Sequence, residues 1–92
     1  MIRTHELKIA EDYADSVWNG DKTFELRYND RGYQKGDIVK FIPIDGLRCE
    51  MIGHPLYAKK YEITYVINGL GLDKDWVVFA IKPITELKEI ER

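Results

Sequence analysis

The sequence has a single cysteine, no long apolar run and no excess of positive charge, and each absence excludes a class of function. Cys49 is the only cysteine among 92 residues, so neither an internal disulfide nor a cysteine-based metal site can form. No stretch approaches the roughly 18 consecutive apolar residues of a membrane-spanning helix, and the first residues lack the apolar centre of a signal peptide. We therefore expect a soluble protein of the cytoplasm without a membrane partner.

Several motifs of catalytic and metal-binding sites begin in this sequence but are not completed. His5 and Glu6 start like the zinc-binding HExxH pattern, yet Ile9 occupies the position of the second histidine. Residues 69–74, GLGLDK, lack the third glycine of a dinucleotide-binding loop, and Ser16 has no histidine near it in the sequence for a hydrolase triad. We expect neither a metal nor a cofactor, and whether the protein is an enzyme stays open.

The composition is that of one small folded domain. Apolar residues make up 45% and aromatic residues 12% of the chain, which is enough for a packed interior but only for one core. The formal net charge is −2, so no overall positive field would attract a polyanion, and any contact with nucleic acid must be local. We predict a single domain over residues 1–92, in which 83–92 form a frayed terminal turn or helix.

Hydrophobic periodicity predicts a short strand that leads into one early helix. The apolar residues that recur at the spacing of one helical face are Ala10, Tyr13, Ala14, Val17 and Trp18. Gly20 follows, where a left-handed C-terminal cap is usual. From Thr23 the period changes to two, which is typical of a half-buried strand. One face of this strand carries Phe24, Leu26 and Tyr28, and the other carries Thr23, Glu25 and Arg27.

Three later segments predict further strands. Residues 37–44 are rich in β-branched residues, with Pro43 marking an edge or a bulge. Residues 59–67 alternate, and their apolar face would carry Tyr61, Ile63, Tyr65 and Ile67. Residues 76–84 are continuously apolar, as in a fully buried strand, whereas 47–58 predict a long connection with at most a short strand. We expect an α+β fold in which about five mostly antiparallel strands curl into a small barrel or half barrel, with the early helix packed on one side.

Charged residues cluster where the helix gives way to the next strand. Lys22 stands at the entrance of this strand, and Glu25 and Arg27 project from one face of it, so that the three share a rim. They form a polar site if the rim meets a cleft, and a solvated strand face otherwise, where such pairs contribute roughly 0 to 1 kcal/mol. Lys8, on the first strand, would join the rim of such a cleft.

The segment from Gly20 to Arg27 has the pattern G-x-K-x-x-E-x-R and follows a short helix. This order resembles the ASCH domains, relatives of the PUA fold, whose hallmark is this segment entering a strand. Five ordered blocks are similar to a small branch of unknown function found in phages and bacteria: HELKI from His5, KTFELRYNDR from Lys22, KGD from Lys35, ITYVINGLGL from Ile63 and WVVFAI from Trp76. The resemblance extends from about Thr4 to Lys82.

The resemblance implies a PUA-like β-barrel that binds RNA or a nucleotide in a cleft between helix and barrel. Lys22, Glu25 and Arg27 would line the floor of this cleft, with Lys8 at its rim. Lysine and arginine suit a phosphate or a base edge, and glutamate suits an exocyclic amine. The candidates for stacking on a base are Tyr28, Tyr33 and Trp76.

Two alternatives stay open. Some small ASCH proteins are similar to amidohydrolases of acylated cytidine, which use a lysine of this segment, a threonine three residues later and a distant glutamate. Lys22 matches the lysine, but Glu25 stands in the place of the threonine and would keep Lys22 charged; in an enzyme these two would be the catalytic candidates. The second alternative is a phage or bacterial module that contacts another protein through exposed aromatic residues. The sequence does not indicate an oligomeric state.

Overall fold

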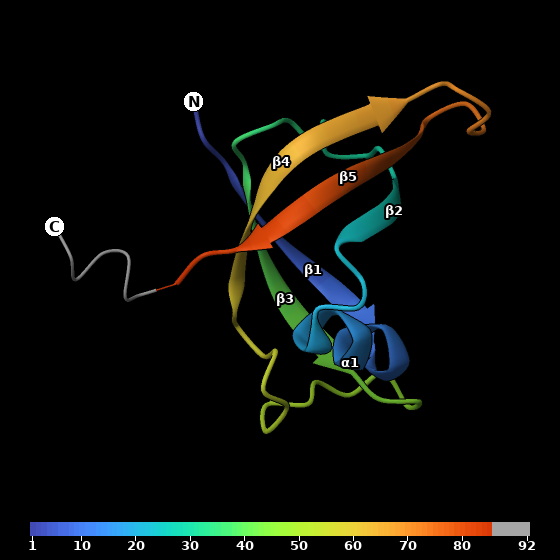
Figure 1. The fold of residues 1–92 in the computed structure, drawn as a ribbon. Coiled ribbons are helices and arrows are strands. Elements are labelled where there is room, and N and C mark those ends of the chain that lie inside the picture. Colours follow the sequence, from blue (N-terminus) through green and yellow to red (C-terminus); the bar gives the residue numbers. More distant parts are fainter. Residues whose placement is uncertain (86–92) are drawn as a thin grey trace, which may run out of the picture.

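The computed structural model describes residues 1–85, in which five strands form a curled half-barrel with one short helix against it (Figure 1). The elements in chain order are β1 (Thr4–Ala10), α1 (Glu11–Asn19), β2 (Phe24–Tyr28), β3 (Ile38–Ile44), β4 (Lys60–Asn68) and β5 (Trp76–Pro83). The predicted α+β architecture, with five strands and one early helix, is confirmed. Of the terminal turn or helix predicted over 83–92, Pro83 belongs to β5, and residues 86–92 lie outside the described part.

The strands lie in the order β1-β3-β4-β5-β2, so β1 and β2 are the two edges of the sheet. Three of the pairings are antiparallel, as expected for most of them. β1 and β3 instead run parallel, which is possible because α1 and β2 lie between them in the chain and provide the long connection that parallel strands need.

The two edges of the sheet are bridged by arginine side chains. Nη2 of Arg27 donates to the carbonyl oxygen of Lys8 at 2.9 Å, and Nη1 of Arg31 donates to that of Glu6 at 3.0 Å. In the described part of the chain β1 and β2 share no ladder, so guanidinium groups satisfy carbonyls that a neighbouring strand would otherwise pair. We call this gap between β1 and β2 the seam.

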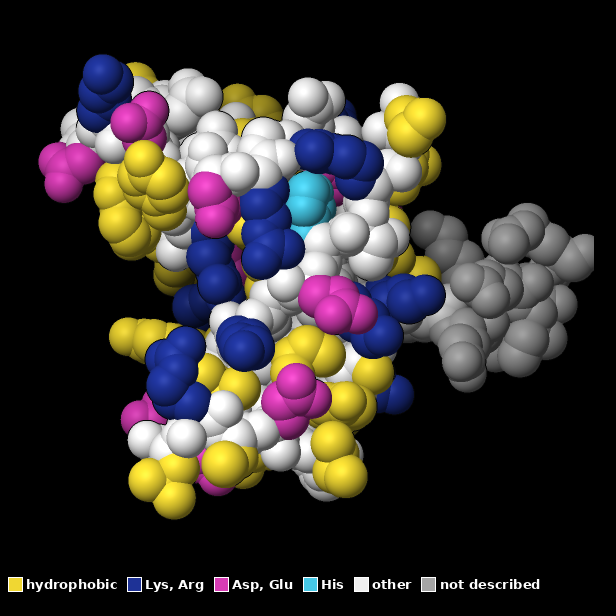
Figure 2. All heavy atoms as spheres, turned by 180° about the vertical axis from the view of Figure 1, so that it is seen from behind, with side chains coloured by type: hydrophobic (Ala, Val, Ile, Leu, Met, Phe, Trp, Pro, Cys, Tyr) yellow, Lys and Arg dark blue, Asp and Glu magenta, His cyan; other side chains and the backbone are white. Residues whose placement is uncertain are grey.

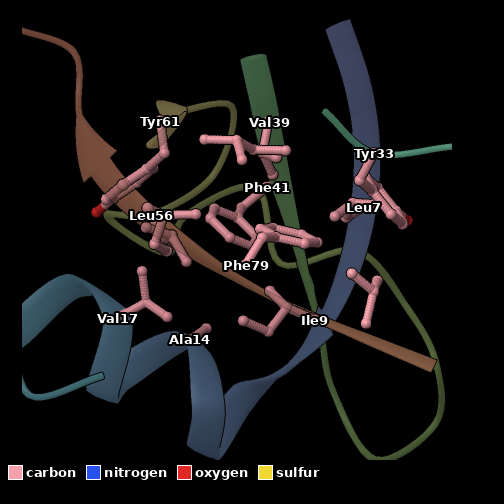
Figure 3. Packing of buried hydrophobic residues seen from close by; sticks show 13 residues of the cluster. Leu7, Ile9, Ala14, Val17, Tyr33, Val39, Phe41, Leu56, Tyr61 and Phe79 are labelled. Atoms are coloured by element: carbon pink, nitrogen blue, oxygen red, sulfur yellow. The ribbon is translucent and has the colours of Figure 1, made fainter. Parts of the chain in front are cut away.

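The core lies inside the curl of the sheet, where α1 covers one end of it. Figure 3 shows Ala14 and Val17 of α1 pointing toward Phe79 of β5 and toward Leu56, which comes from the connection between β3 and β4. The buried cluster comprises Leu7, Ile9, Ala14, Val17, Tyr33, Val39, Phe41, Leu56, Tyr61, Ile63, Val77, Phe79 and Ile81.

The helix is shorter and narrower in its buried face than its pattern predicts. Ala10 ends β1 rather than belonging to the helix, and only Ala14 and Val17 are buried, while Tyr13 and Trp18 are exposed. The predicted cap is confirmed: Gly20 has φ 84°, in the left-handed region that glycine adopts without steric cost, and its N–H donates to the carbonyl of Val17 at 3.1 Å.

β2 is half-buried as predicted, but it buries its polar face. Glu25 is only 3% exposed, whereas Phe24, Leu26 and Tyr28 are 47%, 50% and 52% exposed. Half-buried strands usually turn their apolar face to the core. The inversion places Glu25 and Arg27 inside the curl, where the ion pairs described below hold them.

β4 departs from its predicted alternation at a β-bulge between Ile63 and Tyr65. Tyr61 and Ile63 are buried as expected, but the extra residue turns Tyr65 outward, where it is 61% exposed, and Val66 packs against the core instead. A bulge shifts the faces of a strand in this way because side chains alternate with a period of two.

The remaining strands and the long connection follow their sequence patterns with one further correction. β5 is not buried on both faces: Val77, Phe79 and Ile81 are buried, while the residues between them are partly exposed. Pro43 lies in β3 beyond the pairing with β4, which ends at Lys40, so it behaves as an edge residue there. The connection after β3 contains only an isolated bridge between Ile44 and Glu50, as expected.

Candidate functional site

The end of α1 fixes the position of Lys22. The carbonyl oxygen of Ser16 accepts hydrogen bonds from the backbone N–H groups of Asp21 and Lys22, both at 3.0 Å. One residue later, the carbonyl of Thr23 accepts the N–H of Ile81 and so begins the pairing with β5. The backbone of Lys22 is therefore fixed between the C-terminal cap of α1 and the first hydrogen bond to β5.

Glu25 lies between two cations. Its Oε2 accepts a hydrogen bond from Nζ of Lys22, and its Oε1 accepts one from Nε of Arg27 at 3.0 Å. The Glu25 side chain is 4% exposed, while those of Lys22 and Arg27 are 17% and 26% exposed. A carboxylate buried to this degree needs ionic and hydrogen-bonded partners, and here both oxygens have one.

The cations make further contacts that fix their direction. Nζ of Lys22 also donates to the carbonyl of Phe24 at 2.9 Å, and it lies 5.6 Å and 5.2 Å from the ring centroids of Tyr13 and Phe24. These distances are within the range of a cation–π interaction. Arg27 also donates across the seam to the carbonyl of Lys8, so its guanidinium group contacts both β2 and β1.

These residues line a cavity of about 760 Å³ between α1, the end of β1, and β2. We call it the cleft. Its wall includes Lys8, Lys22, Glu25, Arg27 and Tyr28, so the residues predicted as a site from the sequence lie together. On the face shown in Figure 2, Lys and Arg side chains (dark blue) gather toward the middle, beside hydrophobic side chains (yellow) at the left.

Aromatic residues also line the cleft. Trp76, a candidate from the sequence, forms an edge-to-face pair with Tyr28, with ring centroids 6.0 Å apart and an interplanar angle of 81°. Tyr13 and Phe24 lie in the wall as well, although the sequence patterns assigned them to apolar faces of the helix and of β2. Their place in the cleft wall depends on which face of β2 is buried and on the exposure of Tyr13, and the sequence pattern indicates neither of these.

Tyr33, the third candidate for stacking, is not part of the cleft wall. It is buried in the core, with its ring 4.9 Å from that of His5 and 4.8 Å from that of Phe79. Burial raises the pKa of its hydroxyl above the ordinary value. Thr23, the threonine nearest in sequence to the position that a catalytic threonine would take, is exposed and does not line the cleft.

A second polar cluster lies away from the cleft, around Asp37. Oδ2 of Asp37 is 2.9 Å from Nε2 of His5, and both side chains are buried. Asp37 also accepts the backbone N–H groups of Arg3 and Gln34 at 3.3 Å and 3.2 Å. Burial alone would raise the pKa of Asp37, but the hydrogen bonds from His5, Arg3 and Gln34 outweigh it and hold the pKa below its ordinary value. His5 is thus committed to this pair.

Within residues 1–85 no three histidine, cysteine, aspartate or glutamate side chains are grouped to hold a metal ion. No helix in the same part of the chain is long and apolar enough to cross a membrane.

Comparisons with known proteins identify a family but not an activity. An uncharacterised 12.9 kDa protein in the GpA 3′ region of Escherichia phage P2 is 41% identical over 39 residues. This alignment covers 42% of the present chain and 36% of the phage protein. The family described as "Domain of unknown function (DUF3850)" matches residues 4–81, which run from the start of β1 into β5. The chain therefore belongs to the family of this domain of unknown function, DUF3850.

Proposed function

We propose that this chain binds RNA or a nucleotide in the cleft, with Lys8, Lys22 and Arg27 contacting phosphate and an aromatic side chain stacking on a base. The observation that carries the proposal is the convergence of cations and exposed aromatic rings on one cavity of about 760 Å³. A volume in this range suits a small-molecule ligand. Base stacking and phosphate contacts need these two kinds of side chain.

Glu25 has a supporting role in this proposal. Because its two oxygens are bonded to Lys22 and Arg27 and its side chain is only 4% exposed, it orients the two cations and offers little surface to a base. Lys8 makes no salt bridge among residues 1–85, so its ammonium is the cation best able to take up a phosphate.

The same proposal includes a relationship to ASCH and PUA-like domains. It is supported by the G-x-K-x-x-E-x-R segment from Gly20 to Arg27, by the half-barrel with one early helix, and by the position of the cleft between them. These features fit the arrangement that the resemblance implies.

Thermal unfolding with a panel of nucleosides, nucleotides and short RNAs tests the proposal, because a ligand that binds only the folded state raises the melting temperature. At least one nucleotide or RNA should do so. Lys8→Ala should weaken binding of that ligand about tenfold, as expected for loss of a charged hydrogen bond. Lys82→Ala, an exposed lysine on β5 outside the cleft wall, is the matched control. The proposal is contradicted if no compound of the panel raises the melting temperature, or if Lys8→Ala and Lys82→Ala weaken binding equally.

The amidohydrolase alternative has less support. Nζ of Lys22 already donates to the buried carboxylate of Glu25 and to the carbonyl of Phe24, so it is engaged in structural contacts. No hydroxyl stands in the place of the catalytic threonine, because Glu25 occupies it and Thr23 lies outside the cleft wall. Turnover of an N-acylated cytidine by the purified protein, abolished in Lys22→Ala, would reverse this preference.

A further inference from the structure

The outward face of β2 is a contiguous apolar surface. Phe24, Leu26 and Tyr28 are each about half exposed, and Trp76 of β5 extends this surface through its edge-to-face contact with Tyr28. Single exposed apolar residues are common, but these four also line the cleft, and a run of apolar residues on the wall of a cavity marks an interaction site. The inversion of β2 thus creates a surface that the proposed phosphate contacts do not use.

The aromatic rings of this surface form two separate groups. Tyr28 and Trp76 make up the first, and Phe24 with Tyr13 makes up the second, where the Lys22 ammonium lies over both rings. Phe24 and Tyr28 are four residues apart on one strand, which separates their Cα atoms by about 13 Å. One base cannot cover both groups, so a ligand that uses both must contain several bases.

The charges that line the cleft are positive on balance. Lys8, Lys22 and Arg27 line the cleft together with two carboxylates, Asp21 and Glu25. Three cations against two carboxylates leave a formal charge of +1, and Glu25 is buried between two of the cations, so Lys8 and the exposed sides of Lys22 and Arg27 carry the positive charge of the cleft. A ligand with phosphates between its stacked bases matches this arrangement.

An extended peptide that adds a strand to β2 fits less well. Strand addition needs a free row of backbone groups on the edge strand. Here Nζ of Lys22 already donates a hydrogen bond to the carbonyl of Phe24, so this backbone group is not free for a peptide strand. The side chain of Arg27 crosses the seam to the carbonyl of Lys8.

We propose that the cleft and the outward face of β2 bind single-stranded nucleic acid. One base stacks on the Tyr28–Trp76 group and another on the Phe24–Tyr13 group, and the roughly 13 Å between the Cα atoms of Tyr28 and Phe24 leaves room for one nucleotide between these two, so that the ligand has about three nucleotides. The strand must be single, because bases in a duplex keep their faces stacked on one another. This inference rests on the nucleotide binding proposed above and specifies the form of the ligand.

Competition binding with uridine monophosphate, a uridine trinucleotide and a uridine hexanucleotide tests the inference. The trinucleotide should bind about 5- to 150-fold more tightly than the mononucleotide, the factor that corresponds to about 1 to 3 kcal/mol for one further stacked base, and the hexanucleotide should add little. With three cations in the cleft, the slope of log K against log salt should be no steeper than about −2. A comparison of the DNA and RNA versions of the trinucleotide shows whether binding requires the 2′-hydroxyl.

Tyr28→Leu should reduce the ratio of trinucleotide to mononucleotide affinity, whereas Tyr65→Leu should preserve it. Tyr65 is the matched control, since it is an exposed tyrosine on β4 that does not line the cleft. Equal affinity for the mononucleotide and the trinucleotide overturns this inference but leaves the proposed nucleotide site, while failure of every probe to bind overturns both. A duplex that binds as tightly as its single strand, or a dimer that Tyr28→Leu dissociates, also overturns it.

Discussion

At the scale of single residues, the site depends on the carboxylate of Glu25. Its two oxygens hold Lys22 from the preceding loop and Arg27 from the same strand, and Arg27 in turn reaches β1. Without this carboxylate, two like charges would remain next to each other at a partly buried position. The same side chain therefore stabilises the fold and keeps two cations at the cleft.

We predict that Glu25→Gln lowers the free energy of unfolding by about 1 to 3 kcal/mol, because removing the charge of Glu25 leaves two partly buried cations uncompensated. The amide keeps the shape of the side chain but turns a donor group toward one of the cations. Urea unfolding measures the change. Glu62→Gln, at an exposed position on β4, should alter stability by less than about 0.5 kcal/mol. Equal stability of the two variants would show that the ion pairs contribute nothing.

Much of this site could be predicted from the sequence. The helix cap at Gly20 and the two-residue period after Thr23 suffice to place Lys22, Glu25 and Arg27 near one another. The sequence could not indicate that Glu25 would be saturated by the other two, or that Arg27 would bond to the carbonyl of Lys8. Those contacts depend on how closely the two edges of the sheet approach, which no local pattern encodes.

At the scale of elements, alternation identifies the two faces of a strand but not which one is buried. In β2 the polar face is buried because its charges are paired inside the curl, and in β4 a bulge exchanges the faces halfway along. Each strand was predictable, since its composition and period are local properties. The orientation and the bulge result from tertiary packing.

The bulge in β4 leads to a prediction that contradicts simple alternation. Tyr65→Thr should change the free energy of unfolding by less than about 0.5 kcal/mol, because its side chain is exposed. Val66→Thr should cost about 1 to 3 kcal/mol, because it places a hydroxyl against the core without an assigned partner. Threonine suits strands at both positions, so chemical denaturation of the two variants compares burial directly. The opposite ranking would mean that β4 continues without the bulge.

At the scale of the whole molecule, Asp37 joins parts of the chain that are distant in sequence. It binds the segment that enters β1, through His5 and Arg3, to the turn that precedes β3, through Gln34. Its pKa lies below the ordinary value of 3.8. The ionised form therefore contributes stability that is present above the ordinary pKa and is lost as the pH falls through the lower pKa of the folded state.

Asp37→Asn should accordingly destabilise the protein most near neutral pH, by about 3 kcal/mol as for a broken buried pair. Its difference in melting temperature from the wild type should stay constant down to about pH 5 and narrow below about pH 4. Melting temperatures measured from pH 7 to pH 3 follow this difference. Asp30→Asn, at an exposed aspartate, should show little difference at any pH. If the difference in melting temperature between Asp37→Asn and the wild type is the same at about pH 3 as at pH 7, the effect is due to packing and not to charge.

Among the residues that the structure describes, the seam is joined by side chains and not by a backbone ladder. Four backbone ladders hold the sheet together, whereas its two margins are connected through the guanidinium groups of Arg27 and Arg31, and Arg27 also lines the cleft. Separating β1 from β2 would therefore break the side-chain contacts of two arginines and leave the four ladders intact.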